Sequence, residues 1–552
     1  MEKKSRPECA EEIEAALKDI PRLIMIMPKN GLNEEARESL NDFQIQLSDA
    51  HAGPWHRFWS AALLILFLAC PAFGTTYYLD IDATGNNDGS TEEHAWESWA
   101  DANTGLDALG DDGADDTLLV KTGNYGAIPD DGVLEKPRTG WLKIHADTGE
   151  TPVFTGMLIV RNDLQNMYLE FDGIDFAASA PILYNACMVR VRYGSQVKFL
   201  NCNFIGNGYN HITEAGGETG KGLYLEACAN VEIDECEMYG DGTGDEPWMG
   251  FYYGINGRSC DNVDITDCTI QECGIAITAW GDSWTIARNH VYDGTVDGCQ
   301  ASSVANFVFE DNHFHDFRRP PENEIEHNDC LQLWSAGGVE PGSADYYYTE
   351  NVYIRRNRMY NSGGQIMFWN SFTPDDPPGY EAENIVVENN LMYSAGLDSA
   401  GAWEVSILGE VTCSFINNTI IGSFLVRAKT ELTMKNNIMN IVDFELNKDD
   451  PPTIVYEDYN LIRTWWVSMP GYEQGANTTA VSTEGAFEAL FANHGGEDFT
   501  LAADSTGIDF GDSADAPVLD VLGNARDETP DAGCYEYDAS APVTKYFLGR
   551  QT

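Results

Sequence analysis

One ten-residue pattern returns nine times between Val197 and Ile441 and limits what this chain can fold into. Positions 1, 3 and 8 of the block are almost always apolar. Position 6 is Cys in the first three blocks and Asn in the last six, and successive blocks start 19 to 45 residues apart. In chain order the blocks are VKFLNCNFIG, VEIDECEMYG, VDITDCTIQE, WTIARNHVYD, FVFEDNHFHD, VYIRRNRMYN, IVVENNLMYS, CSFINNTIIG and LTMKNNIMNI, with a weaker copy, LEFDGIDFAA, starting at Leu169.

An apolar residue at every second position is typical of a β-strand with one buried face, so each block begins as a strand. A unit this short cannot bury its apolar face alone, and repetition lets neighbouring units cover one another in a solenoid. The Asn residues at position 6 then stack at the strand spacing of about 4.8 Å and bond along the axis. This register predicts that Phe309, Ile354 and Val387 lie above one another in adjacent coils.

These blocks resemble the repeats of the right-handed parallel β-helix of secreted bacterial pectin-lyase-like proteins, over residues 75–465. The resemblance implies an all-β solenoid with a short N-terminal capping helix, and a glycan as partner. It does not extend to catalytic residues. The Asn-Thr-Asp, Asp-Asp, Gly-His-Gly and Arg-x-Lys series of polygalacturonases is absent, and so is the Arg-rich strand signature of pectate lyases.

The segments outside the repeat differ from it in composition. Residues 1–54 read as an N-terminal extension, with a start codon assigned too early as one explanation. Residues 55–74 have the basic, apolar and small-residue order of a secretory signal, too short for a stable membrane span. Ser90-x-x-Glu93 has capping-box spacing and predicts a helix near Trp96 and Trp99 that covers the open end of the solenoid. Residues 466–552 read as C-terminal strands and a cap.

The net charge of −57, from 89 acidic and 32 basic residues, argues against nucleic acid as a partner, because phosphate binding needs a basic surface. A solvated acidic shell suits a secreted monomer. Bound Ca²⁺ is the candidate cofactor, although no stretch matches the sequence of a known calcium-binding loop.

Thirteen cysteines are present, and their spacing favours columns of reduced thiols inside the coils over a disulfide framework. Cys202, Cys236 and Cys268 share position 6. A Cys228–Cys260 disulfide is the alternative in an oxidising compartment.

The longest spacing between blocks separates those that start at Phe307 and Val352, and it contains the expected strand Asp329–Trp334. Long insertions on solenoids often carry function. With Leu331 and Leu333 pointing inward, Cys330, Gln332 and Trp334 point outward. In the next coil Ile366 and Phe368 would point inward, and Gln365, Met367 and Trp369 outward. We therefore expect Trp334 and Trp369 to be exposed neighbours that bind sugar rings, with Gln332 and Gln365 beside them. Burial of both rings under loops is the alternative.

His327, Asp329 and Gln332 form the most compact polar group, in which His327 is the candidate for acid–base chemistry. Arg318 and Arg319 are the candidate partners for a uronate carboxylate. The alternative for this group is a hydrogen-bonded loop corner. A second candidate is position 7, where His290, His313 and Arg358 occupy three successive coils, with Arg288 and Arg356 at position 5. This column predicts a local positive surface for an anionic sugar, unless it is only a solvated turn.

The leading functional hypothesis is a secreted polysaccharide lyase that acts on an acidic uronate polymer. A hydrolase on the same scaffold and a non-catalytic adhesin or glycan-binding solenoid are the alternatives.

Overall fold

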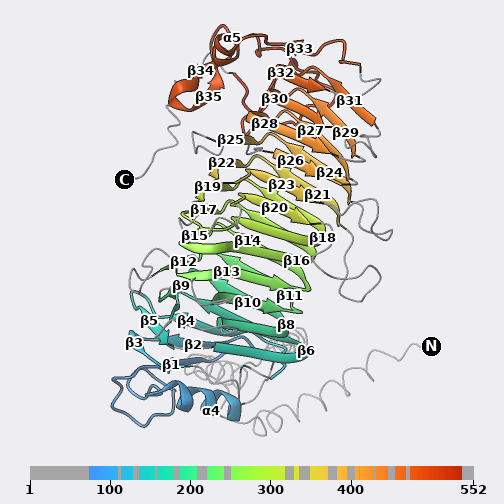
Figure 1. The fold of residues 1–552 in the computed structure, drawn as a ribbon. Coiled ribbons are helices and arrows are strands. Elements are labelled where there is room, and N and C mark those ends of the chain that lie inside the picture. The colour runs from blue at the N-terminus through green and yellow to red at the C-terminus, as the bar shows by residue number, and fades with distance from the viewer. Residues whose placement is uncertain are drawn as a thin grey trace, which may run out of the picture.

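The computed structural model describes residues 74–109, 113–127, 134, 136–155, 158–178, 187–207, 220–240, 250–317, 328–334, 349–362, 364–370, 382–394, 405–409, 411–427, 430–445, 454–467 and 473–537. They form one elongated solenoid of parallel strands (Figure 1). No helix within these residues is long and apolar enough to cross a bilayer.

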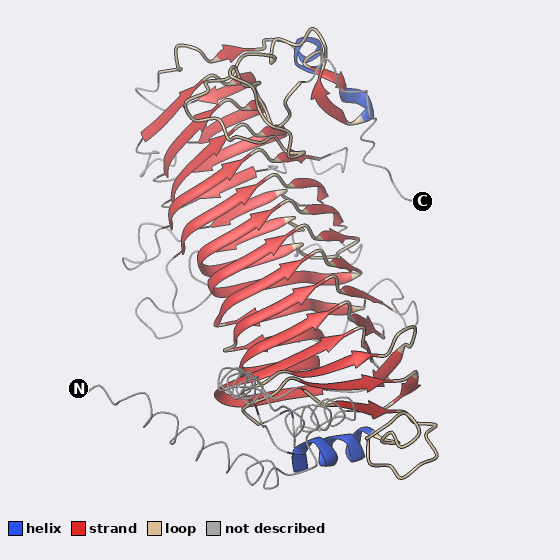
Figure 2. Ribbon diagram, turned by 180° about the vertical axis from the view of Figure 1, so that it is seen from behind, coloured by secondary structure: helices blue, strands red, loops and turns tan. Residues whose placement is uncertain are grey.

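Three faces run along the solenoid, and each strand pairs with the equivalent strand of the coils before and after it (Figure 2). The first face carries positions 1 to 4 of the repeat. Its strands are β1 Thr76–Leu79, β2 Asp116–Val120, β4 Leu142–Ala146, β6 Leu158–Asp172, β8 Cys187–Leu200, β11 Ala229–Asp234, β14 Cys260–Thr266, β16 Cys273–Ala287, β18 Cys299–Glu310, β21 Thr349–Arg355, β24 Ala382–Glu388, β27 Val411–Ile416, β29 Thr430–Lys435 and β31 Ile454–Asp458.

The second face carries positions 7 to 9 of the repeat. Its strands are β3 Gly123–Asn124, β5 Pro152–Thr155, β7 Asp175–Ala177, β9 Asn203–Gly206, β12 Glu237–Gly240, β15 Thr269–Gln271, β17 His290–Tyr292, β19 His313–Phe317, β22 Arg358–Ser362, β25 Leu391–Tyr393, β28 Thr419–Arg427, β30 Ile438–Glu445, β32 Leu461–Val467 and β33 Thr479–Ala480.

The third face combines short strands with parts of the long strands β6, β8, β16, β18, β28, β30 and β32, which turn a corner between faces. Its own strands are β10 Lys221–Glu226, β13 Phe251–Arg258, β20 Leu331–Trp334, β23 Met367–Asn370 and β26 Val405–Leu408.

The predicted register is confirmed. Phe309 pairs with Ile354, and Ile354 pairs with Val387, on adjacent first-face strands. All three side chains are buried in the common core. The inward positions therefore form the continuous apolar columns that the alternation predicted.

The turn from the first to the second face follows from positions 5 and 6. Position 5 is left-handed in all nine blocks, with φ between 50° and 59°, a conformation that Asn and Asp tolerate better than most residues. At position 6, the side chain of Asn289 accepts a hydrogen bond from Cys268 N at 2.9 Å and donates one to Ile265 O at 2.8 Å. The same pattern repeats up the column, so each Asn satisfies backbone groups that the turn leaves unpaired.

The column of stacked position-6 Asn side chains, which we call the Asn ladder, extends one coil beyond the nine blocks. Asn460 is buried and donates to Met434 O at 2.9 Å. Its own N–H donates to Thr478 Oγ1 at 3.2 Å, so a hydroxyl takes the place of the next amide. In the other direction the ladder continues as thiols, because Cys202, Cys236 and Cys268 are buried and unoxidised. Cys228 and Cys260 are also free thiols, in agreement with the reduced columns predicted.

A helix covers the N-terminal end of the solenoid, as expected, but it starts later than the capping box at Ser90 indicated. The helix is α4, Trp99–Leu109, and its first turn is held by Ser98 Oγ, which accepts from Asp101 N at 3.2 Å. Ser90 instead donates to Asp88 within a turn. Trp96 and Trp99 are buried, and Trp96 stacks on Tyr77.

The C-terminal segment packs back along the second face. It contains α5 Glu484–Glu488, η3 His494–Gly496 and the antiparallel pair β34 Phe491–Asn493 and β35 Asp498–Leu501. Its apolar residues form a second core with Leu391, Tyr393, Ile421 and Ile438.

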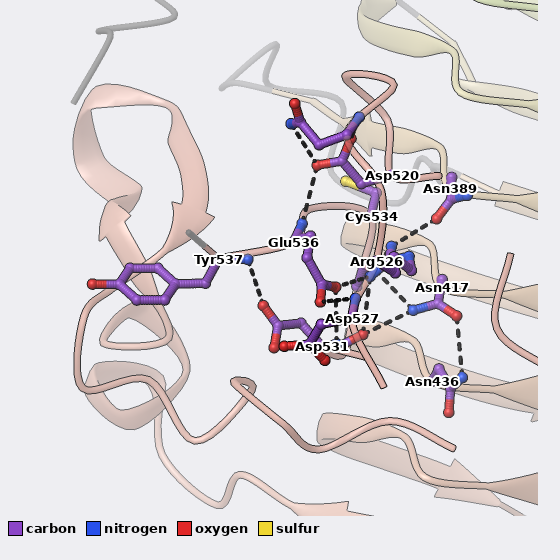
Figure 3. Close-up of polar contacts among 12 residues, drawn as sticks. Asn389, Asn417, Asn436, Asp520, Arg526, Asp527, Asp531, Cys534, Glu536 and Tyr537 are labelled. Atoms are coloured by element: carbon purple, nitrogen blue, oxygen red, sulfur yellow. Dashed lines mark hydrogen bonds and ion pairs between the residues drawn. The ribbon is translucent and has the colours of Figure 1, made fainter. Parts of the chain in front are cut away.

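Position-5 asparagines anchor this segment (Figure 3). Asn389 donates to Leu519 O, and Asn417 to Asp531 O at 2.8 Å. The buried Arg526 bonds Glu536 at 2.9 Å and Asn389 Oδ1 at 2.7 Å. These position-5 asparagines thus satisfy the backbone of the returning chain.

Candidate functional site

The outer surface of the second face gathers six polar or aromatic side chains over three coils. His290 pairs with His313, and His313 with Arg358. Tyr292 and Tyr360 lie beside His315 in the same way. Because side chains alternate along a strand, these residues point away from the core that holds Val291, Phe314 and Met359; Tyr360 is nevertheless only 6% exposed, because it packs against the C-terminal segment. We call His290, Tyr292, His313, His315, Arg358 and Tyr360 the histidine–tyrosine face. The predicted column of His290, His313 and Arg358 is confirmed in its geometry.

The rings of this face stack on one another along the solenoid axis. His290 and His313 have centroids 4.9 Å apart and an interplanar angle of 9°. His315 stacks on Tyr292 at 5.5 Å and 7°, and on Tyr360 at 4.9 Å and 4°. Stacking occupies the ring faces, so the rings turn their edges, with the nitrogen and hydroxyl groups, toward hydrogen-bond partners. The surface is therefore suited to hydrogen bonding more than to stacking of sugar rings.

Hydrogen bonds connect the imidazoles to one another and to neighbours. The Nε2 atoms of His290 and His315 are 2.8 Å apart. His315 Nδ1 is 2.9 Å from Asp316 Oδ2, and His313 Nε2 is 2.8 Å from the Tyr360 hydroxyl.

Burial and nearby positive charge disfavour the protonated form of two of these rings. Burial, with His315 and Arg358 nearby, lowers the pKa of His290 to about 4. The same causes lower the pKa of His313 to about 2. Both rings are therefore neutral near pH 7. Burial also raises the pKa of Tyr360, so its hydroxyl keeps its proton.

Arg358 is half-buried on this face, and no carboxylate among the described residues forms an ion pair with it. Three arginines at positions 4 and 5 of the repeat blocks, Arg288, Arg355 and Arg356, are each paired. A chain of net charge −57 thus carries here a cation that forms no ion pair with any carboxylate of the described residues.

The prediction that Arg288 and Arg356 add to this positive surface is wrong. Arg288 pairs with Asp267 at 2.6 Å, and Arg356 with Asp311 at 2.7 Å. Each partner sits at position 5 of the preceding coil, so the stacking that brings these residues together also neutralises them.

The strand expected to carry the acid–base site is mostly buried on the third face. Asp329 is 1% exposed and Gln332 is 0% exposed, so the expected surface position of Gln332 is wrong. Asp329 Oδ1 accepts from Gln365 N at 2.8 Å, and Asp329 N donates to Asp297 Oδ1 at 2.8 Å. The Asp329 carboxylate therefore joins adjacent coils.

The expected pair of exposed tryptophans is also wrong. Trp369 is 2% exposed and pairs with Leu333, whereas Trp334 is half-buried and pairs with Asn370. The second strand is therefore offset by one residue from the expected alignment, and such an offset exchanges the two faces of a strand. Met367 consequently points into the core beside Leu331. Gln365 is half-buried just before this strand.

Three predicted catalytic residues, His327, Arg318 and Arg319, lie outside the described residues, in the connection from β19 to β20. Sequence reasoning missed His315, Tyr292 and Tyr360. The available signal was position 9, which carries Tyr or His in several blocks, and the His-x-His spacing at His313, which places both rings on one side of a strand.

Comparison with known proteins supports the fold and leaves the activity open. Residues 187–333 match the family model described as "Right handed beta helix region". No curated protein matches the sequence.

Solved structures similar to this chain include the Dettilon tailspike protein (12% identity, TM-score 0.37), covering 62% of this chain and 60% of the tailspike. The pectate lyase Pel9A matches at 12% identity and TM-score 0.33, covering 85% of this chain and 98% of the lyase. PfbA, a surface adhesin of Streptococcus pneumoniae, matches at 13% identity and TM-score 0.44, covering 74% of this chain and 94% of the adhesin. The stacked parallel coils and the family model together identify the chain as a right-handed parallel β-helix protein, the fold of pectin-lyase-like repeat proteins.

Proposed function

We propose that this chain is a secreted, carbohydrate-active β-helix protein that binds an acidic, uronate-containing polysaccharide on the histidine–tyrosine face and cleaves it as a lyase. The observation that carries the proposal is Arg358, a half-buried cation with no acidic partner among the described residues. A guanidinium presents a planar set of donors that matches a carboxylate. The imidazole and phenol edges beside it supply further groups for sugar hydroxyls.

The reaction follows from the chemistry of a uronate. Neutralising its carboxylate makes the proton on the adjacent carbon easier to remove. A base takes that proton, and its electron pair forms a carbon–carbon double bond. The bond from the next ring carbon to the glycosidic oxygen breaks, and that oxygen leaves with the electron pair and takes up a proton from an acid or water. In this proposal Arg358 holds the carboxylate, with Arg318 and Arg319 as additional cations. His327 remains the proposed base, in the connection that follows β19.

The negative net charge of the protein means that a local positive charge is needed to bind an acidic polymer. An acidic protein repels an acidic polymer, and salt screens such repulsion only beyond about 8 Å at physiological ionic strength. A local cation is therefore needed where the polymer binds. The proposal places that cation at Arg358 and retains a bound metal ion as cofactor, for which the sequence favoured Ca²⁺.

The test is a screen of the purified protein on pectate, alginate and other polyuronates, followed by the ultraviolet absorbance of unsaturated product ends. The proposal predicts product with at least one polymer, and loss of activity in Arg358→Ala. Arg288→Ala is the matched control, because Arg288 lies two coils away and already has Asp267 as partner. Equal activity of the two variants would remove Arg358 from the mechanism.

The alternatives give different results in the same screen. A hydrolase produces new reducing ends without the absorbance. An adhesin or glycan-binding solenoid retains the polymer and releases no product.

A further inference from the structure

We infer that His290, His313 and His315 form a binding site for one first-row transition-metal ion, with Zn²⁺ as the type case. One atom from each side chain can be chosen so that all three lie within 4.8 Å of one another. Within the described part of the chain, this is the only such group of three His, Cys, Asp or Glu residues.

The backbone explains why the three rings meet. His313 and His315 are two residues apart on β19, so both point outward from one strand. His290 lies on β17 directly beside His313. Two adjacent strands of a continuous parallel sheet therefore hold all three ligands, and a rigid scaffold of this kind preorganises a metal site.

Asp316 and Tyr360 hold two of the rings by hydrogen bonds, as residues behind the metal ligands do in known metal sites. Asp316 Oδ2 lies 2.9 Å from His315 Nδ1 and leaves His315 Nε2 directed at His290. The Tyr360 hydroxyl lies 2.8 Å from His313 Nε2 and fixes the third ring. A carboxylate or hydroxyl that holds one side of a ligating imidazole sets its orientation and increases its basicity.

The distance between His290 and His315 requires only a small opening. His290 Nε2 and His315 Nε2 are 2.8 Å apart. Two nitrogens bound to a tetrahedral Zn²⁺ at about 2.0–2.1 Å lie about 3.3 Å apart, so separating these two rings by roughly 0.5 Å gives the spacing of two ligands. His313, which lies stacked on His290 at 9°, must also turn a ring nitrogen toward the ion. Three protein ligands leave a fourth position open, as in catalytic zinc sites.

The ligand type selects the metal. Imidazole nitrogens suit Zn²⁺, Cu²⁺, Ni²⁺ and Co²⁺, whereas Ca²⁺ takes oxygen ligands. The inference therefore differs from the calcium expected from the sequence. The charge of Arg358 in the next coil opposes a cation here, but Asp316 and the net charge of −57 favour one.

The inference deepens the proposed function and rests on it in one respect only. If the polymer binds as proposed, the ion and Arg358 form two positive centres for one uronate carboxylate. Metal binding itself does not depend on any polymer, so the two claims can fail separately.

The test is a titration of the EDTA-treated full chain with Zn²⁺, and with Co²⁺ for its visible absorption. We expect one ion per chain, a raised melting temperature, and a Co²⁺ spectrum typical of nitrogen ligands. His313→Phe and His315→Phe keep a ring in the stack but remove the ligand atoms, and each should weaken Zn²⁺ binding at least tenfold. His145→Ala is the control, because His145 lies on β4 and its Nε2 is 2.8 Å from Glu170.

No saturable Zn²⁺ binding by the wild-type chain would overturn the inference. Equal affinity in both Phe variants and the wild type would overturn it as well. Zn²⁺ binding that depends on the histidines, without cleavage of any polyuronate, would support the metal site and reject the lyase. Cleavage that survives EDTA treatment and both Phe substitutions would support the lyase and separate it from the ion.

Discussion

The Nε2 atoms of His290 and His315 lie 2.8 Å apart, although 25 residues separate them in the chain. The coil between them places His290 beside His313, and His315 follows two residues later on the same side of β19. In a solenoid, neighbours on a face are thus residues about one coil apart. The coil lengths can be read from the sequence only where the repeat is clear.

The buried position of Trp369 gives the first prediction. Trp369→Ala removes a ring that is 2% exposed in the core beside Leu333, and should lower the free energy of unfolding by about 3–5 kcal/mol. Trp334→Ala removes a half-buried ring and should cost less than roughly half as much. Denaturant unfolding of both variants measures the difference. Equal and small losses would favour the expectation of two exposed rings and contradict the burial of Trp369.

The Asn ladder gives the second prediction. Asn357 accepts from Asn312 N at 3.0 Å and donates to Phe309 O at 2.8 Å. Asn357→Ala leaves both buried backbone groups unsatisfied, which should cost about 2–6 kcal/mol at 1–3 kcal/mol each.

The control for this substitution is Asn477→Ala, because Asn477 is exposed near the end of the solenoid. It should change stability by less than about 1 kcal/mol. A small effect of Asn357→Ala, measured by the same unfolding experiment, would mean that the ladder contributes little to stability.

Most of the fold could be predicted from the sequence, because each position of the repeat has a fixed place in the coil. Asn at position 6 and apolar residues at positions 1, 3 and 8 specify the turn and the core, and they predicted the register of Phe309, Ile354 and Val387 correctly. Pattern reasoning failed at Trp369, where no block of the repeat fixes the third-face strand. The strand there is aligned one residue away from the expected position, so its inward and outward side chains are exchanged.

The candidate site was predictable only in part. The column of His290, His313 and Arg358 follows from position 7. The contribution of His315 and the pairing of Arg288 with Asp267 depend on which side chains face one another across coils. The return of the C-terminal segment along the second face could not be read from local sequence, because its hydrogen-bond partners are 76 to 137 residues away.

The anchor of the C-terminal segment gives the third prediction. Arg526→Ala leaves Glu536, whose side chain is 8% exposed, without its cation at 2.9 Å. Breaking a buried pair in this way costs about 3–5 kcal/mol. We expect limited proteolysis to cut the C-terminal segment of this variant first.

The comparison variant is Arg463→Ala, which removes a surface ion pair at 3.6 Å from Glu484. Such exposed pairs contribute only about 0–1 kcal/mol. The proteolysis pattern of Arg463→Ala should therefore match that of the wild type. If Arg526→Ala also resists cleavage, the anchor contributes little to holding the segment.

The fourth prediction concerns pH. Burial raises the pKa of Asp531 from 3.8 to about 6. The folded state therefore binds this proton more tightly than the unfolded state, and stability falls as the pH rises from about 4 to about 6. A shift of about two units corresponds to about 3 kcal/mol.

Asp531→Asn should remove this part of the pH dependence. The measurement is the free energy of unfolding of wild type and variant at pH 4, 5, 6 and 7, with the difference in slope attributed to Asp531. Parallel curves would contradict the raised pKa.

The central claim is that Arg358 forms the anionic subsite of the histidine–tyrosine face. Calorimetric titration of the wild type, Arg358→Ala and Arg288→Ala with oligouronates of the polymer bound best tests it most directly. A hydrogen bond to a charged group contributes about 1.5–3 kcal/mol, so Arg358→Ala should bind about 10- to 150-fold more weakly. Arg288→Ala should bind as the wild type does. Undiminished affinity in Arg358→Ala, or an equal loss in both variants, would contradict the account.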